Sequence, residues 1–254
     1  MTSAATPAPD VSLVIPTYDE RENIEQLLPQ ACAVLDGRRY EILVIDDQSP
    51  DGTGDAVRAA AARGLPVQLV SKARKEGIGA ALRVGYGRSR GNVILSMDAD
   101  LSFDPADLPR LLGEIERGAH LVVGTRHGRG GGYESPTLQT RVKWCLSAGG
   151  NWALRTVTGI PLTDFSGNFR AIRRDVWESI ETEENTNILL FEMILKAYVR
   201  GFSVAEVSVT FRDRRFGVSK LQMSREAPRF LRRFWRFIWQ HRRALRRRRR
   251  GGAA

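Results

Sequence analysis

The sequence predicts an α/β protein in which a mostly parallel β-sheet is flanked by helices and followed by a basic amphipathic helix. Short apolar runs, typical of strands buried on both faces, alternate with helical apolar periods in the first half of the chain. This alternation is typical of βαβ units. Polar residues directly follow several of the apolar runs. We expect a flexible segment at residues 1–10, one α/β domain at 11–222 and a helical tail at 223–254.

The first βα unit begins with a strand at residues 11–15, which we expect Pro16 to halt. The loop after Pro16 is acidic and leads into a helix. Ile24, Leu27 and Leu28 set the apolar period of this helix.

Two further strands are predicted at residues 41–45 and 67–70. The first of them ends in 46–53, whose Asp, Ser, Pro and Gly residues are typical of a turn and a helix cap. The second leads through 72–79 into a helix at 80–90. Glycine and lysine beside a helix start suit a phosphate group, and a solvated turn explains them equally well.

The fourth strand, at residues 92–97, ends in Asp98 and Asp100. If strand geometry continues through them, both carboxylates lie on one face, because residues i and i+2 of a strand share a face. Such a pair suits Mg²⁺ or Mn²⁺, which take one or two carboxylates and complete their shell with water and a diphosphate. A turn that favours Asp is the alternative. A fifth strand, at 120–123, ends at 124–126.

The polar segments after the strands are expected to meet at one edge of the sheet. In parallel sheets, ligands bind beyond the carboxyl ends of the strands. The segments at that edge are 16–20, 46–47, 72–75 and 98–100. Their convergence predicts a site for a nucleotide and a metal ion.

Composition restricts the class of protein further. The net charge of +10 lies in the tail, because 225–254 holds twelve arginines and one acid, against 27 basic and 28 acidic residues elsewhere. Cys32 and Cys145 lack metal-ligand spacing, so we expect reduced core residues of a cytoplasmic protein. Residues 1–10 lack a signal-peptide pattern, and no stretch reaches the roughly 20 apolar residues of a membrane span. We therefore do not expect an integral membrane protein.

With these residues assembled, the sequence resembles the inverting GT-A glycosyltransferases of family two. Within that family it is most similar to the polyprenol-phosphate (dolichol-phosphate) mannose synthases. The matching segments, in the family's order, are 15–24, 46–53, 77–81, 98–102, 166–170 and 211–220. The last contains Arg-x-x-Gly-x-Ser-Lys, which is typical of the polyprenol-phosphate branch. The resemblance covers about residues 11–221 and implies a Rossmann-like GT-A fold.

The resemblance implies a donor site and a metal site at the strand ends. The residues expected to bind a nucleotide sugar are Pro16, Tyr18, Glu20, Asp46, Asp47, Lys75, Asp98, Ala99, Asp100 and Arg126. Asp98 and Asp100 would hold Mg²⁺ or Mn²⁺, which neutralises the leaving nucleoside diphosphate.

Several arginines and one lysine are implied to contact phosphate. Arg214 and Lys220 would gather phosphate charge, the first as a planar fork and the second as a point charge. Arg126, Arg141 and Arg170 are further candidates for phosphate or sugar contacts. A solvated surface charge explains Arg126 and Arg141 equally well.

The implied acceptor makes a strong catalytic base unnecessary. A polyprenyl phosphate is already an anion at pH 7, so catalysis rests on positioning and charge stabilisation. Asp164 lies where other family members place a base, and we expect it to orient neighbouring groups, with a helix or turn cap as the alternative. The catalytic residues expected are Asp100, Asp164, Arg170, Arg214 and Lys220.

Three positions depart from the family pattern. Ser102 and Phe103 stand where relatives have Gln and His, so the resemblance leaves open whether this loop supplies a metal ligand beyond the two aspartates. Asn168 replaces a residue that is often small, which affects acceptor or sugar contacts.

The helix predicted after Pro228 is amphipathic. At about 100° per residue, roughly half of its circumference is apolar, through Phe230, Leu231, Phe234, Trp235, Phe237, Ile238 and Trp239. Aromatic residues opposite arginine are typical of a helix in the membrane interface. Residues 242–250 would add attraction to anionic lipids, about 1 kcal/mol per charge. Packing of the aromatics on the body is the alternative; nucleic-acid binding ranks lower, because no nucleic-acid-binding motif accompanies the arginines.

These expectations combine into one function. The sequence predicts a peripheral glycosyltransferase at the cytoplasmic face of a membrane, which moves mannose from GDP-mannose onto polyprenyl phosphate with inversion. A UDP-sugar donor, a saccharide or protein acceptor, and a silent protein that binds membrane or nucleic acid are the alternatives. The expected partners are a nucleotide sugar, polyprenyl phosphate and an anionic membrane surface. No nucleic acid is expected, and a membrane-protein partner stays open.

Overall fold

The computed structural model describes residues 8–128, 130–134, 138–212 and 223–251. The strands are β1 (Val11–Thr17), β2 (Tyr40–Asp46), β3 (Val67–Ser71), β4 (Val93–Ser96), β5 (Leu121–Thr125), β6 (Gly132–Tyr133), β7 (Arg170–Arg173), β8 (Val204–Ser208) and β9 (Thr210–Phe211). The helices are α1 (Arg21–Leu35), α2 (Thr53–Ala62), α3 (Ile78–Arg88), α4 (Leu108–Glu116), α5 (Leu138–Thr158), α6 (Arg174–Ser179), α7 (Ile188–Val199) and α8 (Met223–Gly251), with a 3-10 turn η1 (Pro105–Asp107).

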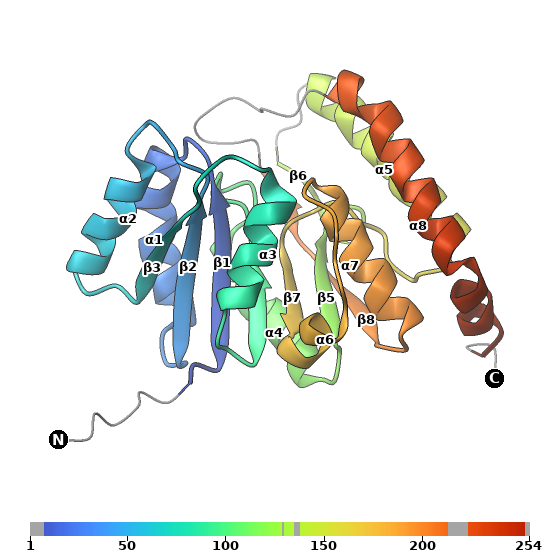
Figure 1. The fold of residues 1–254 in the computed structure, drawn as a ribbon, viewed down its shortest axis with the longest axis horizontal. Coiled ribbons are helices and arrows are strands. Elements are labelled where there is room, and N and C mark those ends of the chain that lie inside the picture. The colour runs from blue at the N-terminus through green and yellow to red at the C-terminus, as the bar shows by residue number, and fades with distance from the viewer. Residues whose placement is uncertain (1–7, 129, 135–137, 213–222, 252–254) are drawn as a thin grey trace.

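A seven-stranded sheet in the order β3-β2-β1-β4-β7-β5-β8 forms the centre of the molecule (Figure 1). In the described part of this sheet, β7 runs antiparallel to both β4 and β5, and the other neighbouring strands are parallel. The predicted α/β class with a mostly parallel sheet is therefore confirmed. Strands β6 and β9 pair separately, beyond the main sheet.

The central strands β1, β2, β4 and β5 bury both faces, which explains their mostly apolar sequences. In β1, Leu13 and Ile15 belong to a core cluster shared with α1, α2 and α4. Val14 points to the opposite face and belongs to a second cluster with α3 and α7. Successive strand residues point to opposite faces, so this alternation places one helical layer on each side of the sheet.

Pro16 does not end the first strand, contrary to the prediction. β1 continues to Thr17, and Pro16 pairs in register with Ile45 of β2. The carbonyl oxygen of Val14 accepts a hydrogen bond from Met97 on the β4 side, whereas that of Thr17 accepts one from Asp47 on the β2 side. Pro16 has the orientation of Val14 and lies beyond the end of β4, so its missing N–H costs no ladder hydrogen bond.

The two cysteines are both free but differ in environment. Cys32 is buried in α1, as expected, whereas Cys145 is exposed on α5, so the prediction of two core cysteines is wrong for the second. Among the described residues, no helix is both long and apolar enough to cross a membrane.

Helix α8 packs on the body of the protein along one of its faces. Phe237 is fully buried, and Ile238 and Leu245 are nearly so, in the core cluster that contains α7. Trp235 and Trp239 on the other face are 56% and 64% exposed. Packing on the body, the alternative to the interfacial helix, therefore holds for one face of α8, and the apolar residues of the other face are exposed.

Docking of α8 predicts unequal effects for two neighbouring aromatic residues. Phe237→Ala should lower the free energy of unfolding by about 3 kcal/mol, because it leaves a cavity in a packed core. Trp239→Ala should change it by less than about 0.5 kcal/mol, since the indole is largely exposed. Urea denaturation of both variants measures the difference. Equal effects of the two substitutions would contradict docking of α8 in solution.

Candidate active site

A cavity of about 390 Å³ opens beyond the carboxyl ends of β1, β2 and β4. Eight of the ten residues predicted for the donor site line it: Pro16, Tyr18, Glu20, Asp47, Lys75, Asp98, Ala99 and Asp100. Its other walls are Thr17, Gly77, Ile78, Ala81, Ser166, Asn168, Thr186, Asn187 and Leu190. The predicted convergence of strand ends is therefore observed.

Lysine charges lie on one side of this cavity. Lys72 Nζ lies 2.7 Å from Asp47 Oδ1, and both side chains are 6% exposed. The buried pair fixes the Asp47 carboxylate, because each charge compensates the other's loss of hydration. Lys75 Nζ lies 3.3 Å from the centre of the Tyr18 ring, a cation–π contact at the cavity wall. An anion entering the cavity therefore meets the charge of Lys75.

Asp46 is not a lining residue of the cavity, and its side chain stabilises the turn next to it. Its carboxylate accepts hydrogen bonds from Thr17 Oγ1 at 3.0 Å, from the Ser49 backbone N–H at 3.0 Å and from Ser49 Oγ at 2.5 Å. The expected contact of Asp46 with a nucleotide is thus not supported. Its hydrogen bonds instead close the turn that presents Asp47.

The two aspartates after β4 reach the same cavity by a route that differs from the prediction. β4 ends at Ser96, and Leu101 has a positive φ of 56°, so strand geometry does not continue through Asp98 and Asp100. A tight turn brings both carboxylates to the cavity, and Asp100 Oδ1 accepts the Ser102 N–H at 3.0 Å.

A buried chain of hydrogen bonds orients Asp98. Asn168 Nδ2 donates to Asp98 Oδ1 at 2.9 Å, and Ser96 Oγ donates to Asn168 Oδ1 at 2.8 Å. Ser96 is in turn 2.7 Å from the Tyr86 hydroxyl, which is fully buried. Asn168, the departure from the family pattern, therefore contacts an expected metal ligand directly.

The carboxylates of Asp98 and Asp100 fit a hard divalent cation that also coordinates oxygen atoms of a bound ligand. No group of three or more His, Cys, Asp or Glu side chains with metal-site geometry occurs in the described part of the chain. Asp98 and Asp100 alone suit Mg²⁺ or Mn²⁺, which keep water or phosphate oxygens in the remaining positions. Ser102 Oγ nearby is buried without a hydrogen-bond partner among the described residues, and Phe103 packs against Phe169 in the core.

Arg126 and Asp164 form an ion pair beside the cavity. Arg126 Nε lies 2.8 Å from Asp164 Oδ2, and the Asp164 side chain is fully buried. Burial raises the pKa of Asp164, but the charge of Arg126 and the hydrogen bonds it accepts outweigh this and hold the pKa below its ordinary value. Both residues hydrogen-bond Ser166, which lines the cavity. This geometry suits an orienting group rather than a base.

Arg170 was predicted to contact phosphate or sugar, but it is buried and does not line the cavity. Its guanidinium is fully buried and donates to the backbone carbonyl oxygens of Gly167, at 3.2 Å from Nε, and of Leu190, at 2.9 Å from Nη1. Burial lowers the pKa of Arg170. The side chain ties β7 to α7 and is not a lining residue of the cavity.

Residues 12–180 match the family described as "Glycosyl transferase family 2". The chain belongs to glycosyl transferase family 2. The predicted membership in this family of glycosyltransferases is thus confirmed.

Curated relatives match over most of the chain. The chain is 36% identical over 222 residues to polyprenol monophosphomannose synthase of Mycolicibacterium smegmatis, covering 84% of this chain and 81% of that protein. It is 35% identical over 218 residues to undecaprenyl-phosphate mannosyltransferase of Micrococcus luteus, covering 83% and 87%. It is 33% identical over 215 residues to dolichol-phosphate mannosyltransferase of Pyrococcus furiosus, covering 84% of this chain but only 59% of that protein.

Solved structures support the GT-A fold. Glucosyl-3-phosphoglycerate synthase from Mycobacterium tuberculosis, in complex with Mn²⁺, UDP and glucosyl-3-phosphoglycerate, is similar with a TM-score of 0.68 at 20% identity. The similarity covers 91% of this chain and 79% of that one. The same protein is also known in complex with Mg²⁺ and UDP.

The cavity has lining residues that no sequence motif predicts, and two predicted residues lie outside the described part of the chain. Thr186, Asn187 and Leu190 line the cavity although no motif marks them, because a polar run before an apolar helix is typical of any helix start. Arg214 and Lys220 lie outside the described residues, as does the side chain of Arg141.

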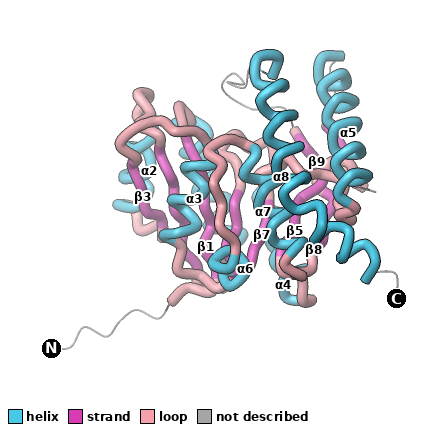
Figure 2. The backbone as a smooth tube through the Cα atoms, turned by 45° about the vertical axis from the view of Figure 1, so that its right-hand side comes forward, coloured by secondary structure: helices cyan, strands magenta, loops and turns pink. Residues whose placement is uncertain are grey.

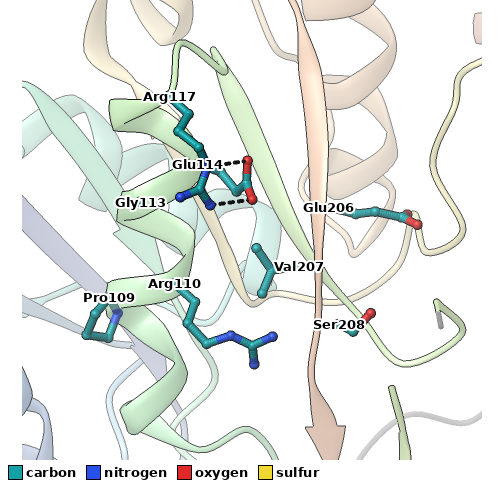
Figure 3. A pocket seen from close by; sticks show the side chains of 8 residues that line it. All are labelled: Pro109, Arg110, Gly113, Glu114, Arg117, Glu206, Val207 and Ser208. Atoms are coloured by element: carbon teal, nitrogen blue, oxygen red, sulfur yellow. Dashed lines mark hydrogen bonds and ion pairs between the residues drawn. The ribbon is translucent and has the colours of Figure 1, made fainter. Parts of the chain in front are cut away.

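A second cavity, of about 520 Å³, lies between α4 and β8 (Figure 3). None of the predicted site residues lines it. Its two arginines already have acidic partners, Arg110 with Asp107 and Arg117 with Glu114. Val207 faces α4, whereas Glu206 points away across β8 (Figure 3). The cavity at the strand ends is therefore the stronger candidate.

The Arg126–Asp164 pair predicts a pH-dependent contribution to stability. Asp164→Asn should cost about 3 kcal/mol of unfolding free energy at pH 7, because it leaves Arg126 largely buried without its counter-charge. A carboxyl with a depressed pKa stabilises the fold above its unfolded pKa, near 3.8, and loses this stabilisation as the pH falls through its folded pKa. The difference between wild type and variant should be constant from pH 8 to about 5 and shrink below about 4. Urea denaturation across this range measures it, and a difference that grows at low pH would contradict the ion pair.

Proposed function

We propose that the protein transfers mannose from GDP-mannose to a polyprenyl phosphate, using Mg²⁺ or Mn²⁺, at the cytoplasmic face of a membrane. The observation that carries the proposal is the pair Asp98 and Asp100 in one cavity with Tyr18 and Lys75. The family resemblance implies that these residues bind a nucleotide sugar and its metal ion. The acceptor is inferred from the three relatives, 33–36% identical, which are mannosyltransferases or mannose synthases of dolichol, undecaprenyl or polyprenol phosphate. The UDP-bound structural neighbour makes a UDP-sugar the second candidate donor.

The chain's own residues account for the transfer by positioning. When bound, the metal ion supplies Lewis-acid stabilisation of the leaving diphosphate. Asp98 is oriented for such an ion by Asn168, and Lys75 supplies positive charge to the same cavity. The acceptor phosphate needs no deprotonation, which agrees with Asp164 being held ionised by Arg126 instead of free to take a proton.

The membrane part of the proposal rests on large apolar side chains that are exposed on α5 and α8. Both helices lie at the same end of the molecule (Figures 1 and 2), and Arg249 of α8 donates to the Thr156 carbonyl oxygen of α5 at 2.7 Å. The large apolar side chains exposed on them are Trp144, Leu146, Trp152, Val157, Leu231, Trp235 and Trp239. Arg232 and Arg243 of α8 are exposed as well, so the chemistry of this helix matches an anionic lipid interface.

Transfer of radiolabelled sugar tests the reaction. GDP-mannose, UDP-glucose and UDP-N-acetylglucosamine are each offered with a short polyprenyl phosphate, with Mn²⁺ or with EDTA. We expect an organic-extractable product from GDP-mannose that EDTA abolishes. Asp100→Ala should lower the rate by about a hundredfold or more, because it weakens charge stabilisation of the leaving group. Asp55→Ala, at an exposed acid of α2, is the matched control. A lipid product from a UDP-sugar alone would show that the donor is a UDP-sugar and not GDP-mannose. The absence of a lipid product with every donor would refute polyprenyl phosphate as the acceptor.

Vesicle sedimentation tests the membrane surface. Trp235→Ala/Trp239→Ala should weaken binding to vesicles that contain phosphatidylglycerol by about tenfold, because both indoles are exposed and would enter the interface. Tyr40→Ala, at a partly buried ring of β2, controls for the loss of an aromatic residue. Unchanged sedimentation of the double variant would contradict the assignment of this surface.

A further inference from the structure

The segment between α6 and α7, residues 181–187, forms a wall of the active-site cavity. We call this segment the strap. Its residues Thr186 and Asn187 line the cavity. Its Asn185 carbonyl oxygen accepts the backbone N–H of Gly79 at 2.9 Å and that of Ala80 at 3.4 Å, both in the first turn of α3. The strap therefore contacts the cavity directly and also through the start of α3.

The strap and the first turn of α3 pack tightly, backbone against backbone. A Cβ atom added at Gly79 would lie 2.6 Å from the Asn185 carbonyl carbon and 2.7 Å from the Glu184 carbonyl oxygen. These atoms belong to the backbone, so a side chain cannot move aside to relieve the contact. Gly77 and Ile78, directly before Gly79, line the cavity. A shift of the strap must consequently displace the cavity wall.

Helix α7 holds the strap on one side. The buried Glu192 carboxylate accepts the backbone N–H of Glu183 at 3.0 Å and that of Glu184 at 3.1 Å. Lys196 Nζ donates to the Glu181 carbonyl oxygen at 2.6 Å. These bonds anchor the strap backbone from the side of α7, while the Glu184 side chain has a different partner.

That partner is α8. The Glu184 side chain is 3% exposed, and it pairs with Arg233 and with Arg236, whose Nη2 lies 3.2 Å from Oε1. Arg236 also approaches Glu183 at 3.4 Å. The two arginines are 44% and 47% exposed and remain hydrated without the pair. The buried carboxylate is not hydrated, so its position depends on the docking of α8.

The docked and exposed faces of α8 allow it to bind lipid while it holds the strap. Phe237 on the docked face is fully buried, whereas Leu231, Trp235 and Trp239 are exposed. We propose that Glu184 is a positioning residue of the donor site, which ties the cavity wall to docked α8, so that a lipid surface holding α8 in place tightens donor binding. The nature of the donor and of the lipid surface rests on the proposed function.

Hydrogen exchange of the ligand-free protein tests, without any substrate, whether the contact of Glu184 with α8 holds the strap in place. Arg233→Ala/Arg236→Ala and Glu184→Gln should each speed exchange of the Gly79 and Ala80 amides by about tenfold or more, because these amides bond to the strap. Arg232→Ala/Arg243→Ala removes the same charge from exposed positions of α8 and should leave both amides unchanged. Arg233→Lys should retain most of the protection. Unchanged exchange in Glu184→Gln and in the Arg233→Ala/Arg236→Ala variant would overturn the proposal.

Calorimetric titration with GDP or UDP, each with Mn²⁺, tests the consequence. Saturating vesicles of phosphatidylcholine and phosphatidylglycerol should tighten nucleotide binding to wild type by about threefold or more. Arg233→Ala/Arg236→Ala should lose this gain, and Arg232→Ala/Arg243→Ala should keep it. A lower melting temperature with the same nucleotide affinity and vesicle response would mean a merely structural role and overturn the proposal. If neither nucleotide binds wild type, the donor assignment fails, and the exchange measurement still decides the role of Glu184.

Discussion

The site depends on one constraint, the parallel pairing of β1 with β2 and β4. Parallel strands present their carboxyl ends at the same edge, so loops far apart in sequence must leave the sheet together. The register of β1 places Thr17 beside Asp46, and β4 ends where β1 passes Val14. The early end of β4 leaves the space that the cavity occupies. It also gives Pro16 a place in the strand without the loss of a ladder hydrogen bond.

Charges around the cavity are held by buried partners before any ligand binds. Asp47 is paired with Lys72, Asp164 with Arg126, and Asp98 is hydrogen-bonded by Asn168. Each arrangement compensates the loss of hydration on burial and also fixes the direction of a side chain. Such preorganisation is what a reaction with an already ionised acceptor requires, because its barrier falls through positioning and charge stabilisation.

Helix α8 joins the surface of the protein to this site. Its buried aromatic face packs with α7, its arginines reach Glu184, and its exposed tryptophans remain available to a lipid interface. Packing on the body, one of the two alternatives for the arm, therefore holds for one face of α8. Contact of the other face with a membrane stays a proposal.

The sequence by itself determined the α/β class, the strand ends and the two aspartates, because apolar runs and the polar residues after them are local features of the chain. Its motifs also indicated the family, and membership is confirmed by the match over residues 12–180. Tertiary structure alone decided that Arg170 and Asp46 stabilise the site without lining its cavity. Arg170 donates to the Leu190 carbonyl oxygen and Asp46 accepts from Thr17, and both partners are distant in sequence. It likewise decided that Thr186 and Asn187 line the cavity, and which face of α8 is buried. Such features depend on which elements pack together, and neither residue type nor spacing records that.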